Sequence, residues 1–212
     1  MSCRLAVLVS GSGTNLQALM DSTGRDGCAA EIAVVVSNKI DAYGLERARQ
    51  AGIEALHIPH QGKDRVDFER ALVSALQERA IEWVLLAGFG RILTPVFLDA
   101  FAGRVLNIHP ALLPRFPGMN AQRKAFDAGV LFSGATVHFV DAGTDTGPII
   151  AQGVVSRIAE DTVEDFSARI LRMEHRLFPM VMRWASDGRL QQVDGAAVVQ
   201  LNSGESRVLF DE

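Results

Sequence analysis

The sequence predicts an α/β fold with an open, mostly parallel sheet and helices on both of its faces. Short, continuous apolar runs alternate with longer segments in which apolar residues recur at helical spacing. Strands that are apolar throughout are buried on both faces, so this alternation is typical of a parallel sheet covered by helices. The length of 212 residues and the hydrophobic content of 48% are compatible with one domain that buries a substantial core.

In the first half of the chain, strands are expected at 5–9, 32–36, 83–87 and 105–108. Helices are expected between them at 15–21, 44–51 and 65–79. Gly52 is a natural stop for the second of these helices. Thr94 and Pro95 predict the start of a further helix, because Thr caps a helix and Pro fits its first position. Right-handed crossovers would then place the helices on both faces.

After Pro110 the pattern changes. Three prolines, Pro110, Pro114 and Pro117, indicate a stiff loop, and a short helix is expected over 122–127. Strands are expected at 135–140 and 149–154, and a long helix runs from the cap at 161–162 to about residue 184. The tail from residue 190 suggests a hairpin. The simplest account is one domain, 1–212, with functional halves of about 1–100 and 101–212.

Composition excludes several classes of protein. The net charge of −4 gives no basic surface for nucleic acid. No apolar run approaches the length of a membrane span, and no spacing typical of a metal site is present. Cys3 and Cys28 are expected to be free thiols in a reducing compartment. We therefore expect a cytoplasmic protein that requires no metal.

The most informative segment is the apolar run that ends in Asn107 and His109. Side chains alternate along a strand, so these two point to the same side, and Pro110 then ends the strand. An amide and an imidazole at the carboxyl end of a strand suit a reaction that builds negative charge on a carbonyl oxygen and moves protons. The alternative is a core histidine beside a turn asparagine.

The loop over 11–15, Gly-Ser-Gly-Thr-Asn, lies between the first strand and the first helix. Small residues and free N–H groups at a helix start favour an anion. Leu16 occupies the third glycine position of a dinucleotide fingerprint, and the lysine of a P-loop is missing. A single phosphate group is therefore the expected ligand of this loop. The alternative is a plain strand-to-helix turn that binds no ligand.

Two further segments allow either a functional or a structural interpretation. The glycines around Phe89 in 87–93 could admit a flat ring, or could form a tight turn. The acidic loop 141–148 follows the strand that carries His138, and a carboxylate beside an imidazole can relay protons, although such loops are usually solvated turns.

Glu174 lies within the long helix, where a solvated face is the default. His57 and His60 receive no role.

Together these segments resemble the phosphoribosylglycinamide formyltransferases of purine synthesis, within the formyltransferase superfamily. The similarity covers nearly the whole chain and rests on SGSGTNLQAL, SNKIDAYGLERA, LAGFGRIL, VLNIHPALLPRFPG, TVHFVDAGTDTGPIIAQ and the helix around Glu174. LNIHPALLP and the DTGP loop are shared with other 10-formyltetrahydrofolate enzymes. The resemblance implies the formyltransferase fold, an open and Rossmann-like sheet.

The resemblance also implies the roles of individual residues. The catalytic trio would be Asn107, His109 and Asp145, with His138 as a weaker candidate behind it. The substrate phosphate would be held by Gly13, Thr14 and Asn15, and Glu174 would receive the amine or the ribose. The folate would be held by Arg65, Arg91, Ile92, Leu93, Asp141 and Asp145. Asn120, Gln122 and Gly90 depart from the residues common in the family.

The implied reaction transfers a formyl group from the co-substrate 10-formyltetrahydrofolate to the amine of phosphoribosylglycinamide, by direct attack and a tetrahedral intermediate. The amide of Asn107 and a protonated His109 are expected to donate to the oxyanion, with Asp145 keeping His109 cationic. Neither a metal nor a covalent enzyme intermediate is needed, and a monomer or a homodimer is compatible with the sequence.

Three other functions remain as alternatives. A 10-formyltetrahydrofolate hydrolase would share the trio but usually has an additional amino-terminal domain, and here the first strand begins at Arg4. A methionyl-tRNA formyltransferase should have a basic carboxyl-terminal domain. A non-catalytic folate- or nucleotide-binding module would also use glycine loops, but would not need an oxyanion donor aligned with a proton relay.

Overall fold

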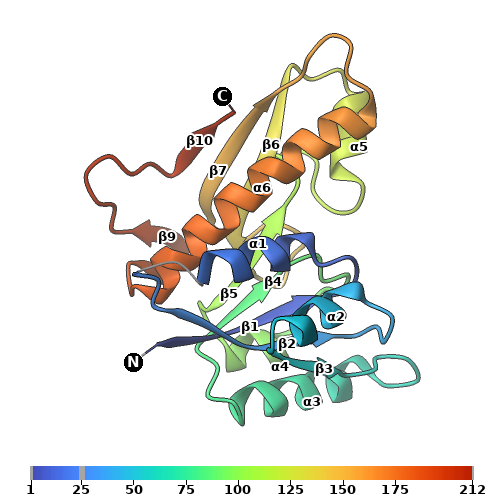
Figure 1. Cartoon of the computed structure of the whole chain (residues 1–212), viewed down its shortest axis with the longest axis vertical. Coiled ribbons are helices and arrows are strands. Elements are labelled where there is room, and N and C mark those ends of the chain that lie inside the picture. Colours follow the sequence, from blue (N-terminus) through green and yellow to red (C-terminus); the bar gives the residue numbers. More distant parts are fainter. Residues whose placement is uncertain (1, 24–26, 212) are drawn as a thin grey trace.

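An eight-stranded sheet forms the centre of the computed structural model, which describes residues 2–23 and 27–211. The strand order is β10-β7-β6-β5-β4-β1-β2-β3 (Figure 1). β8 and β9 form a separate two-stranded sheet. The strands are β1 (Cys3–Val9), β2 (Ala30–Ser37), β3 (Glu54–His57), β4 (Trp83–Leu86), β5 (Val105–His109), β6 (Phe132–Phe139), β7 (Ile149–Ser156), β8 (Leu190–Val193), β9 (Ala196–Val199) and β10 (Val208–Phe210).

Helices cover both faces of this sheet (Figure 1). They are α1 (Thr14–Thr23), α2 (Tyr43–Gln50), α3 (Arg65–Gln77), α4 (Pro95–Ala100), α5 (Ala121–Asp127) and α6 (Val163–Ser186). Alternate residues of β1 enter two separate cores, with Leu5 and Val7 in one and Ala6 and Leu8 in the other. The first core also contains residues of α1, α2, α5 and α6, and the second contains residues of α3 and α4.

The sheet is parallel through β3, β2, β1, β4 and β5, and changes direction at β6. β6 is antiparallel to both β5 and β7, and β10 returns to a parallel pairing with β7. This register places His138 of β6 directly opposite Asn107 of β5. Directly paired residues share one face of a sheet, so the two side chains are neighbours.

The α/β architecture and the mostly parallel sheet are confirmed, as is the hairpin, which is β8 with β9. β5 reaches one residue further than expected and includes His109 itself. Thr162 caps α6 together with Asp165, whereas Asp161 pairs with Arg169. The two edge strands, β3 and β10, were not among the expected strands. Within the described ranges, no helix is both long enough and apolar enough to cross a membrane.

Candidate functional site

A cavity of about 580 Å³ lies beyond the carboxyl ends of β4 and β5. Ligands bind at this position in open α/β sheets, and the volume suits a small molecule. Most of the site residues expected from the sequence line it: Arg91, Ile92, Leu93, Asn107, His109, His138, Asp141 and Asp145. Three segments that are far apart in the sequence therefore meet around one cavity.

His109 is 4% exposed, and both of its ring nitrogens face hydrogen-bond acceptors. Nδ1 lies 3.2 Å from Oδ2 of Asp145, and Nε2 donates to the carbonyl oxygen of Phe116 at 2.9 Å. A neutral imidazole has only one N–H, so this arrangement is fully satisfied by the doubly protonated ring. Burial lowers the pKa of His109 below its ordinary value, and the Phe116 carbonyl and the Asp145 carboxylate oppose that effect only in part.

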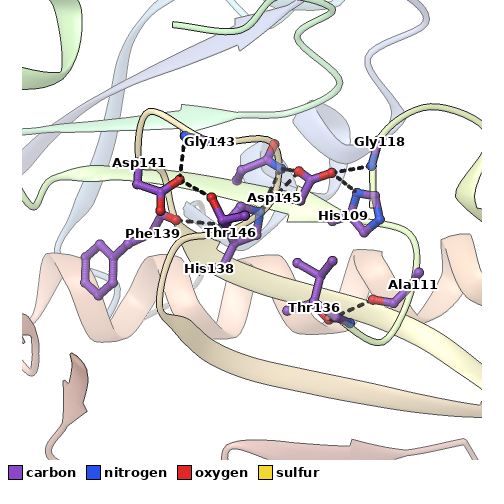
Figure 2. A network of polar contacts seen from close by, with 12 residues as sticks. His109, Ala111, Gly118, Thr136, His138, Phe139, Asp141, Gly143, Asp145 and Thr146 are labelled. Carbon is purple, nitrogen blue, oxygen red and sulfur yellow. Dashed lines mark hydrogen bonds and ion pairs between the residues drawn. The ribbon is translucent and has the colours of Figure 1, made fainter. Parts of the chain in front are cut away.

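Asp145 lies between the two histidines, in the loop that follows β6 (Figure 2). Its φ of +55° is in the left-handed region, and Oδ2 accepts the N–H of Gly118 at 2.7 Å. Burial raises the pKa of this carboxyl, but His138, Gly118 and His109 outweigh that effect and lower the pKa to about 2. The carboxylate is therefore ionised at neutral pH, and its charge favours the protonated form of His109 against the effect of burial.

His138 and Asn107 form the adjacent part of the network. Nδ1 of His138 lies 2.7 Å from the carbonyl oxygen of Phe139, and Nε2 lies 3.1 Å from Nδ2 of Asn107. Nδ2 of Asn107 is also 3.5 Å from Oδ1 of Asp145. In the loop after β6 that also carries Asp145, Oδ1 of Asp141 accepts hydrogen bonds from Gly143 and Thr146 (Figure 2).

Two groups that contact His109 and Asp145 belong to the backbone of the proline-rich loop. This loop is anchored by Thr136, whose hydroxyl donates to the Ala111 carbonyl and accepts the Leu113 N–H (Figure 2 shows the contact with Ala111). Almost any residue type can supply a backbone carbonyl or N–H, so the sequence does not identify Phe116 and Gly118 as contacts of the site. The prolines indicate only that this loop is stiff.

The loop expected to bind phosphate begins where β1 ends. Gly13 has a φ of +71°, and a Cβ placed there would lie 2.7 Å from the Cα of Gly44. Arg47 of α2 donates from Nε to the carbonyl oxygen of Ser12 at 2.9 Å, which places a cation beside the loop. Arg47 lies within the SNKIDAYGLERA segment, but no role could be assigned to it from the sequence, because its partner is again a backbone oxygen.

Glu174 corrects an expectation from the sequence. It was assigned to a solvated helix face by default, but it is only 5% exposed, because α6 packs against α1. Its Oε2 accepts a hydrogen bond from Nδ2 of Asn15 at 2.7 Å. Burial raises the pKa of Glu174 to about 7, against the opposing effect of Asn15. The resemblance implies that Glu174 receives the amine or the ribose, and in the structure this residue contacts Asn15 of the loop expected to bind phosphate.

Some expected residues lie outside the cavity. Arg65 is exposed at the start of α3, and neither the phosphate loop nor Glu174 contributes to the cavity lining. The two regions are nevertheless linked, because Ser10 at the end of β1 accepts the N–H of Gly90 at 2.9 Å. In the portion of the chain that the structure covers, no cluster of three potential ligands could hold a metal ion.

The chain is similar to several known proteins. Residues 3–182 match the family described as formyl transferase. Phosphoribosylglycinamide formyltransferase of Haemophilus influenzae is 42% identical over 195 residues, which is 92% of each chain. The crystal structure of glycinamide ribonucleotide transformylase 1 from Symbiobacterium toebii superposes with a TM-score of 0.91 at 47% identity, covering 94% of this chain and 95% of that one. A formyltetrahydrofolate deformylase from Pseudomonas syringae gives 0.86 at 28% identity, over 94% of this chain and 66% of that one.

Proposed function

The chain belongs to the formyl transferase family, and on that premise we propose how its residues carry out the reaction. Its activity is the transfer of a formyl group to phosphoribosylglycinamide, a step of purine biosynthesis. The formyl donor is folate-derived, and we propose that it is 10-formyltetrahydrofolate. The products are then formylglycinamide ribonucleotide and tetrahydrofolate.

We propose that the ribonucleotide binds by its phosphate at Gly13, Thr14 and Asn15. The start of α1 supplies free N–H groups there, and Arg47 adds positive charge behind the loop. Glu174, bonded to Asn15, receives the glycinamide amine or the ribose. A hydrolase that uses water as its acceptor would not need this phosphate loop.

The folate occupies the cavity in this proposal. Backbone groups of Arg91, Ile92 and Leu93 face the pterin on one side, and the loop from Asp141 to Asp145 encloses it on the other. Arg65, exposed at the start of α3, contacts the folate tail or the phosphate. The cavity volume of about 580 Å³ lies within the usual range for sites that bind small molecules.

The chemistry begins with the amine as the free base. Its lone pair attacks the formyl carbon, and the electrons of the C=O bond move to oxygen. His109 stabilises the resulting oxyanion by donating a proton in a hydrogen bond. Nε2–H of His109 donates to the Phe116 carbonyl, so in this proposal the same N–H must also reach the oxyanion.

The intermediate then collapses by breaking the bond between the formyl carbon and the folate nitrogen. One proton must leave the attacking amine, and one must reach that folate nitrogen. Asp145 is ionised, so it can hold His109 as a cation and order the water that relays this proton. The observation that carries the proposal is this carboxylate, placed between His109 and the N–H of Gly118 in the wall of the cavity.

Replacing His109 by Ala tests its proposed role as the donor to the oxyanion. We expect turnover to fall by about 10²–10³, the usual effect of removing one group that stabilises an oxyanion. Affinity for the ribonucleotide, measured by calorimetry, should stay within about threefold because the phosphate loop is unchanged. Turnover near that of the wild type would contradict the assignment.

We also propose that both substrates are small molecules and that neither nucleic acid nor a membrane takes part. Cys3 and Cys28 are both free thiols, as expected for a protein in the reducing cytoplasm. In this proposal the chain is one domain, in which the first half holds the phosphate and the second half supplies the catalytic trio.

A further inference from the structure

We infer that His138 is a positioning residue that turns the Asn107 side chain so that its carbonyl oxygen faces the cavity. Asn107 then accepts an N–H from the attacking amine, and stabilisation of the oxyanion falls to His109. The inference rests on the proposed function, because the role of the oxygen presupposes an amine in the cavity. It differs from the expectation that the amide nitrogen of Asn107 donates to the oxyanion.

The partners of the His138 ring determine where its hydrogens lie. Nδ1 lies 2.7 Å from the Phe139 carbonyl oxygen, which can only accept, so Nδ1 carries a proton (Figure 2). His138 is 2% exposed, and Asp145 lies closer to His109, at 3.2 Å, than to Nε2 of His138, at 3.6 Å. A buried cation without a close counter-ion of its own would be costly, so the inference places a single proton on the His138 ring, at Nδ1, and a lone pair on Nε2.

That lone pair has one partner within hydrogen-bond distance among the described residues. Nδ2 of Asn107 is 3.1 Å away, whereas Oδ1 of Asp145 is 3.6 Å away, beyond a normal hydrogen bond. Asn107 therefore donates one amide hydrogen to His138. The antiparallel register of β5 and β6, which pairs these two residues directly, makes the contact possible.

Asp145 supports the same orientation of the amide from the other side. Nδ2 of Asn107 lies 3.5 Å from Oδ1 of the ionised Asp145. If the amide were rotated, its oxygen would face that carboxylate and would also require a proton on Nε2 of His138. Both neighbours therefore favour the amide nitrogen at this position.

The oxygen of Asn107 is left for the substrate. It makes no hydrogen bond to any residue that the structure describes, and it is not among the buried polar atoms that lack a partner. Asn107 is half-buried and lines the cavity, so this oxygen is open to it. A primary amine carries two N–H groups, and fixing one of them would direct the nitrogen lone pair toward the formyl carbon.

The first test determines which ring nitrogen of His138 carries a proton, and it does not depend on activity. Nitrogen NMR of histidine-labelled enzyme at neutral pH distinguishes the two neutral tautomers from the imidazolium, and loss of one signal in His138→Gln assigns it among the five histidines. We expect His138 to carry its proton on Nδ1 alone. A proton on Nε2 would overturn the inference even if the enzyme transfers formyl groups as proposed.

The second test uses kinetics. His138→Leu removes the acceptor for the Asn107 amide, and we expect kcat to fall about tenfold while KM for both substrates changes by less than about threefold. His138→Gln offers an amide oxygen at this position and should recover most of kcat. His57→Gln, an exchange on the edge strand β3, is the matched control and should leave both constants unchanged.

A double variant separates positioning from general damage. If His138 acts through Asn107, adding His138→Leu to Asn107→Ala should change kcat by less than about twofold. A full additional loss in the double variant, or failure of Gln to rescue, would show that His138 acts independently of Asn107. If no variant, wild type included, transferred a formyl group to phosphoribosylglycinamide, the proposed function would fail while the NMR result would still stand.

Discussion

At the scale of single residues, the site is organised around one carboxylate with two histidines beside it. Asp145 is 3.2 Å from His109 and 3.6 Å from His138, yet the two rings have different partners. His109 faces acceptors on both nitrogens, whereas His138 faces an acceptor on one and an amide donor on the other. The two rings therefore have different hydrogen-bonding surroundings, which suit them to different tasks.

Asp145 predicts a dependence of stability on acid. Its pKa falls from 3.8 to about 2 in the folded protein, so it contributes stability above about pH 4 that is lost as the pH falls toward 2. The shift corresponds to about 2 kcal/mol. Asp145→Asn should lack this part of the pH dependence, as measured by urea unfolding at a series of pH values. If the free energy of unfolding depended on pH in the same way in the wild type and the variant, the ion pair of Asp145 with His109 would be contradicted.

Glu174 predicts a pH dependence of stability with the opposite sign to that of Asp145. Its pKa rises from 4.5 to about 7, so the folded state favours the protonated form and loses stability as the pH rises through 7. Glu174→Gln removes this loss and keeps an oxygen for Asn15. The variant should therefore be more stable than wild type above pH 7, by up to about 3 kcal/mol, with no such gain below about pH 4.5.

Thermal unfolding across this pH range measures the effect. A Gln variant that is less stable than wild type at every pH would show that Glu174 is ionised and well satisfied in the folded protein. Turnover should fall in either case, because the same carboxyl is proposed to receive the substrate.

At the scale of elements, the end of each strand determines what reaches the cavity. The alternation of Asn107 and His109 on β5 could be predicted from the sequence, because side-chain direction along a strand follows from spacing alone. The pairing of Asn107 with His138 could not, because the reversal of β6 depends on which strands become neighbours. The contacts from Phe116 and Gly118 are backbone groups, so no residue type identifies them.

The phosphate loop gives a prediction about close packing. In Gly13→Ala the new Cβ would meet the Cα of Gly44 at 2.7 Å, and φ is +71°. We expect the loop to shift away from α2 and KM for the ribonucleotide to rise about tenfold or more, with a smaller change in KM for the folate.

Gly188→Ala is the matched control for this prediction. Gly188 has a φ of +72°, but nothing lies within 4 Å of a Cβ built there. The control therefore shares the backbone strain without the contact, and it should lose some stability while KM for the ribonucleotide stays the same. Equal effects on KM in the two variants would show that the packing of Gly13 on Gly44 is unimportant for binding.

At the scale of the whole molecule, one sheet carries both of the proposed binding regions. The phosphate loop follows β1 and the cavity lies beyond β4 and β5, and these three strands are consecutive in the sheet. Ser10 connects the two regions by accepting the N–H of Gly90 and donating to Asn38 at 2.6 Å. The proposed substrates would therefore meet across neighbouring strand ends.

Most of this architecture could be predicted, because buried strands and amphipathic helices leave strong periodic signals. β10 could not, since three residues with two exposed apolar side chains give no clear pattern. The burial of Glu174 was also hidden, because a charged residue within a helix usually indicates a solvated face. Its environment is created by the packing of α6 on α1, which is a property of the folded chain.

The central claim is that the chain moves a formyl group from a folate to phosphoribosylglycinamide. The most direct test follows by absorbance the loss of the formyl group from 10-formyltetrahydrofolate, or from a stable dideaza analogue, with and without phosphoribosylglycinamide. We predict loss only when the ribonucleotide is present. Loss without the ribonucleotide would instead indicate a hydrolase, and no loss in either case would contradict the proposed transfer altogether.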